Sequence, residues 1–282
     1  MKKSNTKKIL AAILSVVLVF GMVAMLASCG GNETADNGDT TAAPAPASDM
    51  EYVKEKGTLV IGVTDFAPMD YHEGESEEWV GFDADLARAF AESLGVKAEI
   101  IEIEWDNKLF ELDGKTIDCV WNGMTLTDEV KASMECSNGY CNNAQVVIVP
   151  KDKADEYATA EACKELNFAV EAGSAGAEQA DAYGFNKTEV LAQADAVMEV
   201  AGGTCDAAII DTLMAIATVG EGTAYEDLTY TAKLNTEEYG VGFRKGSDLA
   251  NELNEFFKTS YADGSMMEIA EKYGIQDTVI AQ

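Results

Sequence analysis

The chain has 282 residues and a formal net charge of −30, with 50 Asp and Glu against 20 Lys and Arg. A polyanion of this kind repels phosphate backbones, so we expect no nucleic-acid partner. His72 is the only histidine, which excludes a His-rich metal site. A Ser-His-Asp triad would have to contain His72. We therefore predict no metal, no cofactor and no catalytic residue, in a chain long enough for one large or two modest domains.

The amino terminus has the order of an export signal. Four lysines within the first eight residues precede an uncharged run at residues 9–27. This run ends in Leu26-Ala-Ser-Cys29, which resembles the lipobox of bacterial lipoproteins. The resemblance implies that residues 1–28 are a cleaved signal peptide and that Cys29 carries a lipid. An uncleaved membrane anchor is the alternative.

Residues 29–50 contain small polar residues, Ala, Pro and acids, with almost no large apolar side chain. Such a segment cannot bury enough surface to offset the entropy of ordering, so we predict a flexible tether. The chain is then expected at the extracytoplasmic face of the cell membrane, held there by its lipid.

Apolar and helical patterns alternate after the tether. Residues 58–63 form a short apolar run typical of a buried strand, and a helical pattern follows that ends at Gly95. Strand-like residues 98–103 and 117–121 flank a helical stretch at 107–112. This alternation predicts a βαβ sheet.

The same alternation starts again after a second apolar run and ends in a helical tail. The predicted elements are strands at 144–149, 168–170, 189–191, 206–210 and 239–243, and helices from 175 and at 192–200, 248–261 and 265–273. Two α/β units of similar size predict two lobes.

Five cysteines follow Cys29, and an odd number cannot pair completely. Their spacing matches no metal-binding pattern. Cys119 lies in an apolar run and is predicted to be buried. Cys136 and Cys141 are the close pair in sequence, and a disulfide between them is the less favoured alternative.

Seven short segments occur in a characteristic order: Gly62-Val-Thr-Asp-Phe-Ala-Pro-Met69, Gly81-Phe-Asp-Ala-Asp-Leu86, Gly114-Lys-Thr-Ile-Asp118, Gly123-Met-Thr-Leu-Thr-Asp-Glu129, Ala172-Gly-Ser-Ala-Gly176, Asp206-Ala-Ala-Ile-Ile-Asp211 and Tyr239-Gly-Val-Gly-Phe-Arg-Lys245. In this order they resemble the extracellular solute-binding proteins of polar-amino-acid ABC importers, family 3.

For the fold, the resemblance implies an α/β, two-lobed, periplasmic-binding-protein-like architecture of type II, whose lobes are joined by two crossing strands. The crossings are expected near residues 143–146 and 239–241. Lobe 1 would then comprise residues 51–143 plus 241–282, and lobe 2 residues 144–240.

For function, the resemblance implies a protein that captures a small polar solute, an amino acid first of all, by hinge closure. The solute would pass to the permease of an ABC transporter. We expect a monomer that is not an enzyme. Two alternatives stay open on the same scaffold, an exported dehydratase-type enzyme and a sensory ligand-binding module. An enzyme would need a perturbed acid, base or nucleophile beside its substrate.

The predicted ligand site begins with aromatic and strand-end residues. Phe66 and Trp105 match the family's aromatic walls, and core packing is the alternative for both. Asn122, Gly123 and Thr125 follow a strand, where ligands of open α/β sheets bind, and a plain turn is the alternative.

The rest of the predicted site is acidic or belongs to a helix start. Ser174 and Ala175 begin a helix whose first amides would suit a ligand carboxylate, and a simple cap is the alternative. Asp211 matches the acid that pairs with the ligand's α-ammonium, with helix capping as the alternative. Together with Asp65 and Glu171, it favours a cationic or neutral polar solute.

One residue departs from the family pattern. The resemblance implies an arginine after Glu129 that grips the α-carboxylate, and this chain has Val130 followed by Lys131. The carboxylate is then expected to be held by the Ser174 and Ala175 amides with a lysine, for which Lys131 is the candidate. A ligand that is not an ordinary α-amino acid is the alternative.

Overall fold

The computed structural model describes residues 48–282, so the predicted signal peptide, Cys29 and most of the predicted tether lie outside the described residues. The first helix, α1 (Asp49–Lys56), begins at the end of the predicted tether, and the Ser48 hydroxyl caps it by accepting from the Glu51 amide. Across residues 48–282, each helix is too short or too polar for a transmembrane span.

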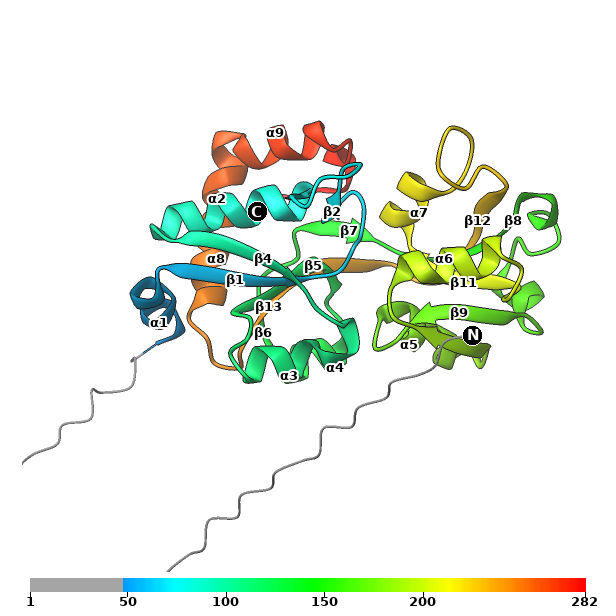
Figure 1. The fold of residues 1–282 in the computed structure, drawn as a ribbon, viewed down its shortest axis with the longest axis horizontal. Coiled ribbons are helices and arrows are strands. Elements are labelled where there is room, and N and C mark those ends of the chain that lie inside the picture. The colour runs from blue at the N-terminus through cyan, green and yellow to red at the C-terminus, as the bar shows by residue number, and fades with distance from the viewer. Residues whose placement is uncertain (1–47) are drawn as a thin grey trace, which may run out of the picture. The chain divides into compact units, whose positions relative to one another are not determined.

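The first of two large sheets contains the amino-terminal strands (Figure 1). Within residues 48–282 its strand order is β4-β1-β5-β13-β6, and β7 also pairs with β13. Its strands are β1 (Thr58–Val63), β4 (Lys97–Glu102), β5 (Cys119–Thr125), β6 (Glu135–Cys136), β7 (Cys141–Asn143) and β13 (Glu237–Phe243). Its helices are α1, α2 (Phe82–Leu94), α3 (Lys108–Asp113), α4 (Asp128–Ser133), α8 (Leu249–Asp263) and α9 (Ser265–Lys272). A small hairpin, β2 (Tyr71–His72) with β3 (Trp79–Val80), lies before α2.

The second sheet has the order β10-β9-β11-β8-β12. Its strands are β8 (Gln145–Pro150), β9 (Asn167–Glu171), β10 (Asn186–Val190), β11 (Ala207–Asp211) and β12 (Leu228–Lys233), and its helices are α5 (Ala175–Tyr183), α6 (Gln193–Ala201) and α7 (Thr212–Thr218). We call the parts built on the first and second sheets lobe 1 and lobe 2. The chain thus forms the two α/β lobes that the sequence predicted.

Alternating side chains cover both faces of the central strands. In lobe 1, Ile61 and Trp121 belong to one buried apolar cluster, whereas Val120 and Met124 belong to another on the opposite face. Strands buried on both sides appear in the sequence as continuous apolar runs. Their ends are therefore held firmly, and these ends carry the polar residues described below.

The chain changes sheets at two places. The first lies between Asn143, which ends β7, and Gln145, which begins β8. The second lies between Lys233 and Glu237, because β13 already pairs with β7 from Glu237 onward. Residues 237–240, which the sequence analysis assigned to lobe 2, therefore pair within the first sheet. Glu237 and Glu238 interrupt the apolar pattern, so the sequence analysis began this strand at residue 239.

The five cysteines among the described residues are free thiols, including Cys136 and Cys141. Cys119 is fully buried in the central strand β5, as the apolar run predicted. Cys141 is also buried, and burial raises the pKa of its thiol. It therefore acts as a small packed side chain.

Candidate functional site

Most of the sequence-predicted residues line one cavity with walls from both lobes. The lining residues are Trp105, Asn122, Gly123, Thr125, Glu171, Ser174, Ala175 and Asp211, with Gln193 in addition. Several stand at the ends of β5, β9 and β11, where ligands of α/β sheets bind. The cavity measures about 20 Å³, the room of about one water molecule, so its walls lie close together in this structure.

The Asp211 carboxylate accepts three hydrogen bonds on one oxygen. Its Oδ1 accepts from the Asn143 amide, from the Gln145 amide at 3.0 Å and from the Tyr239 hydroxyl at 2.7 Å. Asp211 occupies the N-cap position of α7, yet its side chain makes no capping hydrogen bond. Burial and the neighbouring Glu237 charge raise the pKa of Asp211 to about 7.

Glu237, the first residue of β13, shares the same amide donors. Its Oε1 accepts from Asn143 at 2.6 Å, from Gln145 at 2.8 Å and from the Thr125 hydroxyl at 2.9 Å. These donors are all neutral. Two carboxylates from different lobes are thus bridged by hydrogen bonds that leave their negative charge in place.

Glu171, the last residue of β9, is 2% exposed and lines the cavity. Its Oε1 has no hydrogen-bond partner within the described part of the chain. Burial and repulsion from Asp211 raise its pKa to about 8, and the Lys108 charge opposes this rise. A buried carboxyl with a free acceptor at a cavity wall can bind a donor or a cation of a ligand.

Lys108, on α3, is a buried cation beside the cavity that the sequence analysis did not predict. Its Nζ donates to the Trp105 carbonyl at 3.2 Å and, from one lobe to the other, to the Gly173 carbonyl at 2.8 Å. The ammonium also lies 4.9 Å from the centre of the Trp105 ring. Burial lowers the Lys108 pKa, and the Glu171 charge counteracts this effect.

The Asn122 side chain and the Gly123 amide are engaged inside the protein. Asn122 Oδ1 accepts from the amide and the hydroxyl of Thr64, and its Nδ2 donates to the Thr64 carbonyl and to Asp70. The Gly123 amide donates to Asp83 at 2.7 Å. Gly123 has a φ of +54°, where glycine is favoured, and an added Cβ would lie 2.6 Å from Phe66 Cε1. Both residues therefore fix the cavity wall.

Ser174 both caps a helix and lines the cavity. Its hydroxyl accepts from the Ala177 amide at 3.2 Å, which is the capping role considered from the sequence. The same position brings the first turn of α5, with Ala175, to the cavity. A helix amino terminus there favours a negatively charged ligand group.

Phe66 and Asp65 do not line this cavity. Phe66 is fully buried and packs edge-on against Tyr239, with ring centres 6.2 Å apart, so it supports Gly123 from behind. Asp65 is exposed and lines a separate depression with Glu102, among others. The aromatic side chain that reaches the cavity wall is Trp105.

Lys131 and Val130 also lie outside the cavity. Lys131 is exposed in an adjacent groove of about 490 Å³ that shares Thr125 and Ala175 with the cavity. Val130 is buried and lines a further depression together with Lys108. The position where the resemblance implies an arginine is therefore next to a buried lysine.

Sequence analysis missed several polar residues at this site: Lys108, Asn143, Gln145, Gln193 and Glu237. One usable indication was present. Asn143 and Gln145 are two residues apart at the edge of an apolar run, and side chains at that spacing lie on the same face of an extended chain. Lys108 gave no such indication, because lysine is rarely buried.

Comparisons with known proteins identify the family. The chain matches the family model of bacterial extracellular solute-binding proteins, family 3, over residues 59–276. The L-cystine-binding protein TcyJ of Escherichia coli K12 is 28% identical over 227 residues, or 79% of this chain and 85% of the relative. The arginine-binding extracellular protein ArtP of Bacillus subtilis is 29% identical over 242 residues, or 83% of this chain and 91% of the relative.

A solved structure with a similar fold is the ancestral amino acid-binding protein AncCDT-1, described as a precursor of cyclohexadienyl dehydratase. It aligns with a TM-score of 0.73 at 29% identity and covers 80% of this chain and 99% of its own.

Proposed function

Because the chain belongs to the bacterial extracellular solute-binding proteins of family 3, we propose that it captures an α-amino acid with a cationic side chain and delivers it to an ABC importer. One observation carries the choice of ligand. Glu171 is buried at the cavity wall, and its Oε1 lacks a partner among residues 48–282, beside the already acidic Asp211.

The charges around the cavity support two cation subsites. Asp211, oriented by amides and Tyr239, is placed to accept the α-ammonium of the ligand. Glu171 remains for a second cation, and the Trp105 ring, which lines the same cavity from lobe 1, can cover it through cation–π contact. A cation at each subsite would remove the cost of burying unpaired carboxylates.

A ligand carboxylate has candidate partners on the opposite side. The first turn of α5 at Ser174 and Ala175 presents a positive helix end, and the Lys108 ammonium is bound to the carbonyl that precedes Ser174. We assign to Lys108 the role that the sequence analysis gave to Lys131, because Lys108 is the buried member of the two. It compensates for Val130 at the family's arginine position.

Closure of the lobes follows from contacts that cross between them. Lys108 of lobe 1 donates to Gly173 of lobe 2, and Tyr239 of lobe 1 donates to Asp211 of lobe 2. The proposed hinge consists of the two places where the chain changes sheets, at residues 143–145 and 233–237. Lobe 1 would then be residues 51–143 with the carboxyl-terminal segment from 237 onward.

The predicted lipid on Cys29 belongs to the same proposal. A tethered monomer on the extracytoplasmic face of the membrane would meet its permease in that membrane. The site needs no bond-breaking group for this role, so we propose a binding protein and not a dehydratase. Labelling with a lipid precursor should depend on Cys29 and should disappear in Cys29→Ala.

A thermal-shift and calorimetry screen tests the ligand. A ligand at 100 times its Kd stabilises the folded state by about 2.7 kcal/mol. L-arginine and L-lysine should raise the melting temperature most, L-glutamine less, and L-glutamate not at all. Stabilisation by L-glutamate alone would overturn the cationic assignment. Dehydration of a cyclohexadienyl substrate without a tightly bound amino acid would favour the enzyme.

A further inference from the structure

Two fully buried carboxyls lie behind the cavity wall, in a place that ligand binding does not use. Asp70 follows the loop after β1, and Asp83 belongs to the first turn of α2. Asp70 Oδ2 accepts from the Asn122 side chain at 2.8 Å, and Asp83 Oδ2 accepts from the Gly123 amide at 2.7 Å. Two consecutive residues of the wall are thus each held by one buried acid.

The second oxygen of each acid is not engaged. Within residues 48–282, neither Asp70 Oδ1 nor Asp83 Oδ1 has a hydrogen-bond partner. Tyr140 donates its hydroxyl to Asp83 at 2.7 Å, which is a neutral contact. Arg88 is bound to Asp85 and to a backbone carbonyl, so it acts on Asp70 only from a distance.

The remaining ionisable groups around the pair add no positive charge. They are Asp85, Cys119, Tyr140 and Cys141. Two neighbouring carboxylates without a cation cannot both ionise at ordinary pH, because burial and mutual repulsion penalise the second charge. Burial and the Asp83 charge accordingly raise the pKa of Asp70, and burial raises that of Asp83.

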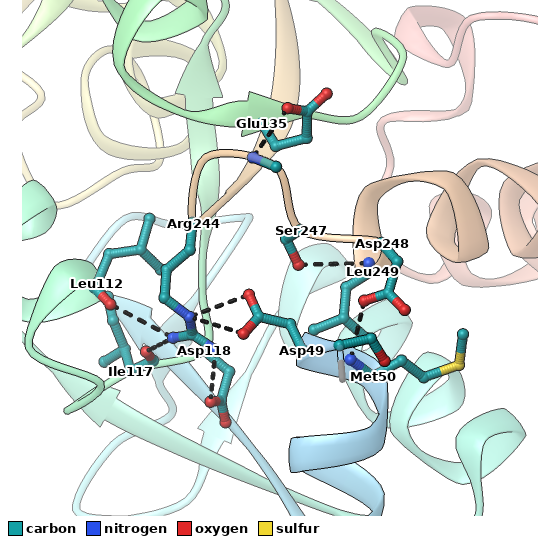
Figure 2. Close-up of polar contacts among 12 residues, drawn as sticks. Asp49, Met50, Leu112, Ile117, Asp118, Glu135, Arg244, Ser247, Asp248 and Leu249 are labelled. Carbon is teal, nitrogen blue, oxygen red and sulfur yellow. Dashed lines mark hydrogen bonds and ion pairs between the residues drawn. The ribbon is translucent and has the colours of Figure 1, made fainter. Parts of the chain in front are cut away.

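Asp118, in the same lobe, shows the opposite arrangement. It is also fully buried, but it forms an ion pair with Arg244 (Figure 2). It forms a second ion pair with Lys56 and accepts from the Val60 amide. Its negative charge is balanced by cations of this chain. Asp118 therefore serves as a matched control for a buried acid that does not touch the cavity wall.

We propose that Asp70 and Asp83 share one proton and that this proton positions Asn122 and Gly123 in the ligand-binding wall. With one proton, the pair carries a single charge, which the Asn122 and Gly123 donors and the Tyr140 hydroxyl stabilise. Loss of that proton at alkaline pH leaves two repelling carboxylates. They separate and move the two wall residues that they hold.

The pair also contacts the site through aromatic packing. The Tyr140 ring packs on the Tyr239 ring, with centres 6.4 Å apart, and the Tyr239 hydroxyl donates to Asp211 in the cavity. Movement of Asp83 and Tyr140 would therefore also displace Asp211, through the Tyr239 ring and its hydroxyl. Asp70 and Asp83 act as positioning residues, since neither lines the cavity.

Nuclear magnetic resonance of the Gly123 amide tests the proposal without a ligand. In the wild type, the Gly123 amide proton should shift as pH rises above neutrality and the pair loses its shared proton. The shift should persist in Asp118→Asn and vanish in Asp83→Asn, whose amide oxygen still accepts from Gly123 and Tyr140 but cannot ionise. If Asp83→Asn does not fold, Asp70→Asn supplies a second test: Asp83 then ionises without a neighbouring carboxylate, so the Gly123 shift should move to lower pH. A flat Gly123 profile in the wild type, or an unchanged one in the folded variant, overturns the proposal.

Calorimetry with L-arginine gives the functional readout, which rests on the proposed function. Wild-type affinity should decline above neutral pH relative to Asp83→Asn, by up to about tenfold per pH unit if one proton controls the wall. Asp83→Ala, which removes the acceptor, should bind less tightly than Asp83→Asn throughout. If L-arginine does not bind while Gly123 still titrates, the proposed ligand is wrong and the proton-sharing pair stands.

Discussion

Two groups of buried acids in this molecule differ in how their charge is balanced. The first, which we call the arginine cluster, consists of Arg244, Asp49 and Asp118, which Figure 2 shows, together with Lys56. Arg244 binds both aspartates and also donates to two backbone carbonyls. Every charge in this cluster has a partner of opposite sign within the chain. It fixes α1 to lobe 1 from residue 49 onward.

The second group lies in the cleft and comprises Glu171, Asp211 and Glu237. Neutral amides and hydroxyls orient Asp211 and Glu237, and Lys108 is the cation that opposes Glu171. The comparison separates two uses of buried charge. The arginine cluster is complete and holds structure, whereas the cleft acids remain short of positive charge, which our proposal assigns to a ligand.

The largest effect is expected from Arg244→Met. The change leaves Asp49 and Asp118 without their shared guanidinium, and breaking a buried ion pair in this way costs about 3–5 kcal/mol of folding stability. Denaturant unfolding measures it. Lys258→Met, which removes an exposed ion pair with Glu255, should stay within about 0.5 kcal/mol. Equal losses in the two variants would contradict a structural role for the cluster.

Asp211→Asn should weaken ligand binding strongly and change folding stability little, which is the reverse of what we expect for Arg244→Met. Loss of one partner of a desolvated charge pair costs about 2–5 kcal/mol of binding, which calorimetry with L-arginine measures. The unfolding free energy should hardly fall, because the variant removes an unbalanced buried charge and keeps an oxygen that accepts from Tyr239. Unchanged affinity with a lowered melting temperature would show that Asp211 stabilises the fold, as the acids of the arginine cluster do, and does not bind the ligand.

The fold was largely predictable because its central strands are buried on both faces. The apolar runs at residues 58–63, 144–149 and 206–210 correspond to β1, β8 and β11, where polar residues lie only near the start of each run. The edge strands were harder. β12 was missed and β10 was placed late, because Thr, Lys and Glu alternate in strands that face solvent.

The site was predictable in position and less so in its contacts. Strand ends identified Glu171 and Asp211, but Glu237 meets Thr125 and Gln145 only through the folded topology, with 112 and 92 residues between the partners. Burial of Lys108 depends in the same way on Gly173, 65 residues away. Sequence spacing carries no information on such pairs.

Lys108→Met should weaken binding by about 1.5–3 kcal/mol, the value of a hydrogen bond to a charged group, since it removes the Gly173 contact and the cation for a ligand carboxylate. The aliphatic stem of the side chain is kept. Lys131→Met, on the exposed groove, is the matched control and should change affinity little. If Lys131→Met proves the more damaging, the carboxylate partner is the lysine first predicted from sequence.

The smallest expected effect is a pH dependence that comes from Glu171. Its pKa is raised from the ordinary value to about 8 in the free protein. The folded state therefore holds a proton that the unfolded state loses, so this contribution to stability is complete below the ordinary pKa and is lost as pH rises to about 8.

Binding has the opposite sign. A ligand cation favours the ionised Glu171, so complex formation releases a proton just below pH 8. Relative to Glu171→Gln, wild-type affinity for L-arginine should therefore rise by at most about 1.4 kcal/mol per pH unit there. Calorimetry in buffers of different ionisation enthalpy measures the number of protons that are released on binding. Glu171→Gln should release fewer protons than the wild type, with the remainder from Asp211, whose pKa is also raised. Asp65→Asn, an acid outside the cavity, should release as many as the wild type. Undiminished proton release in Glu171→Gln would leave Glu171 as a carboxyl that stays protonated in the complex.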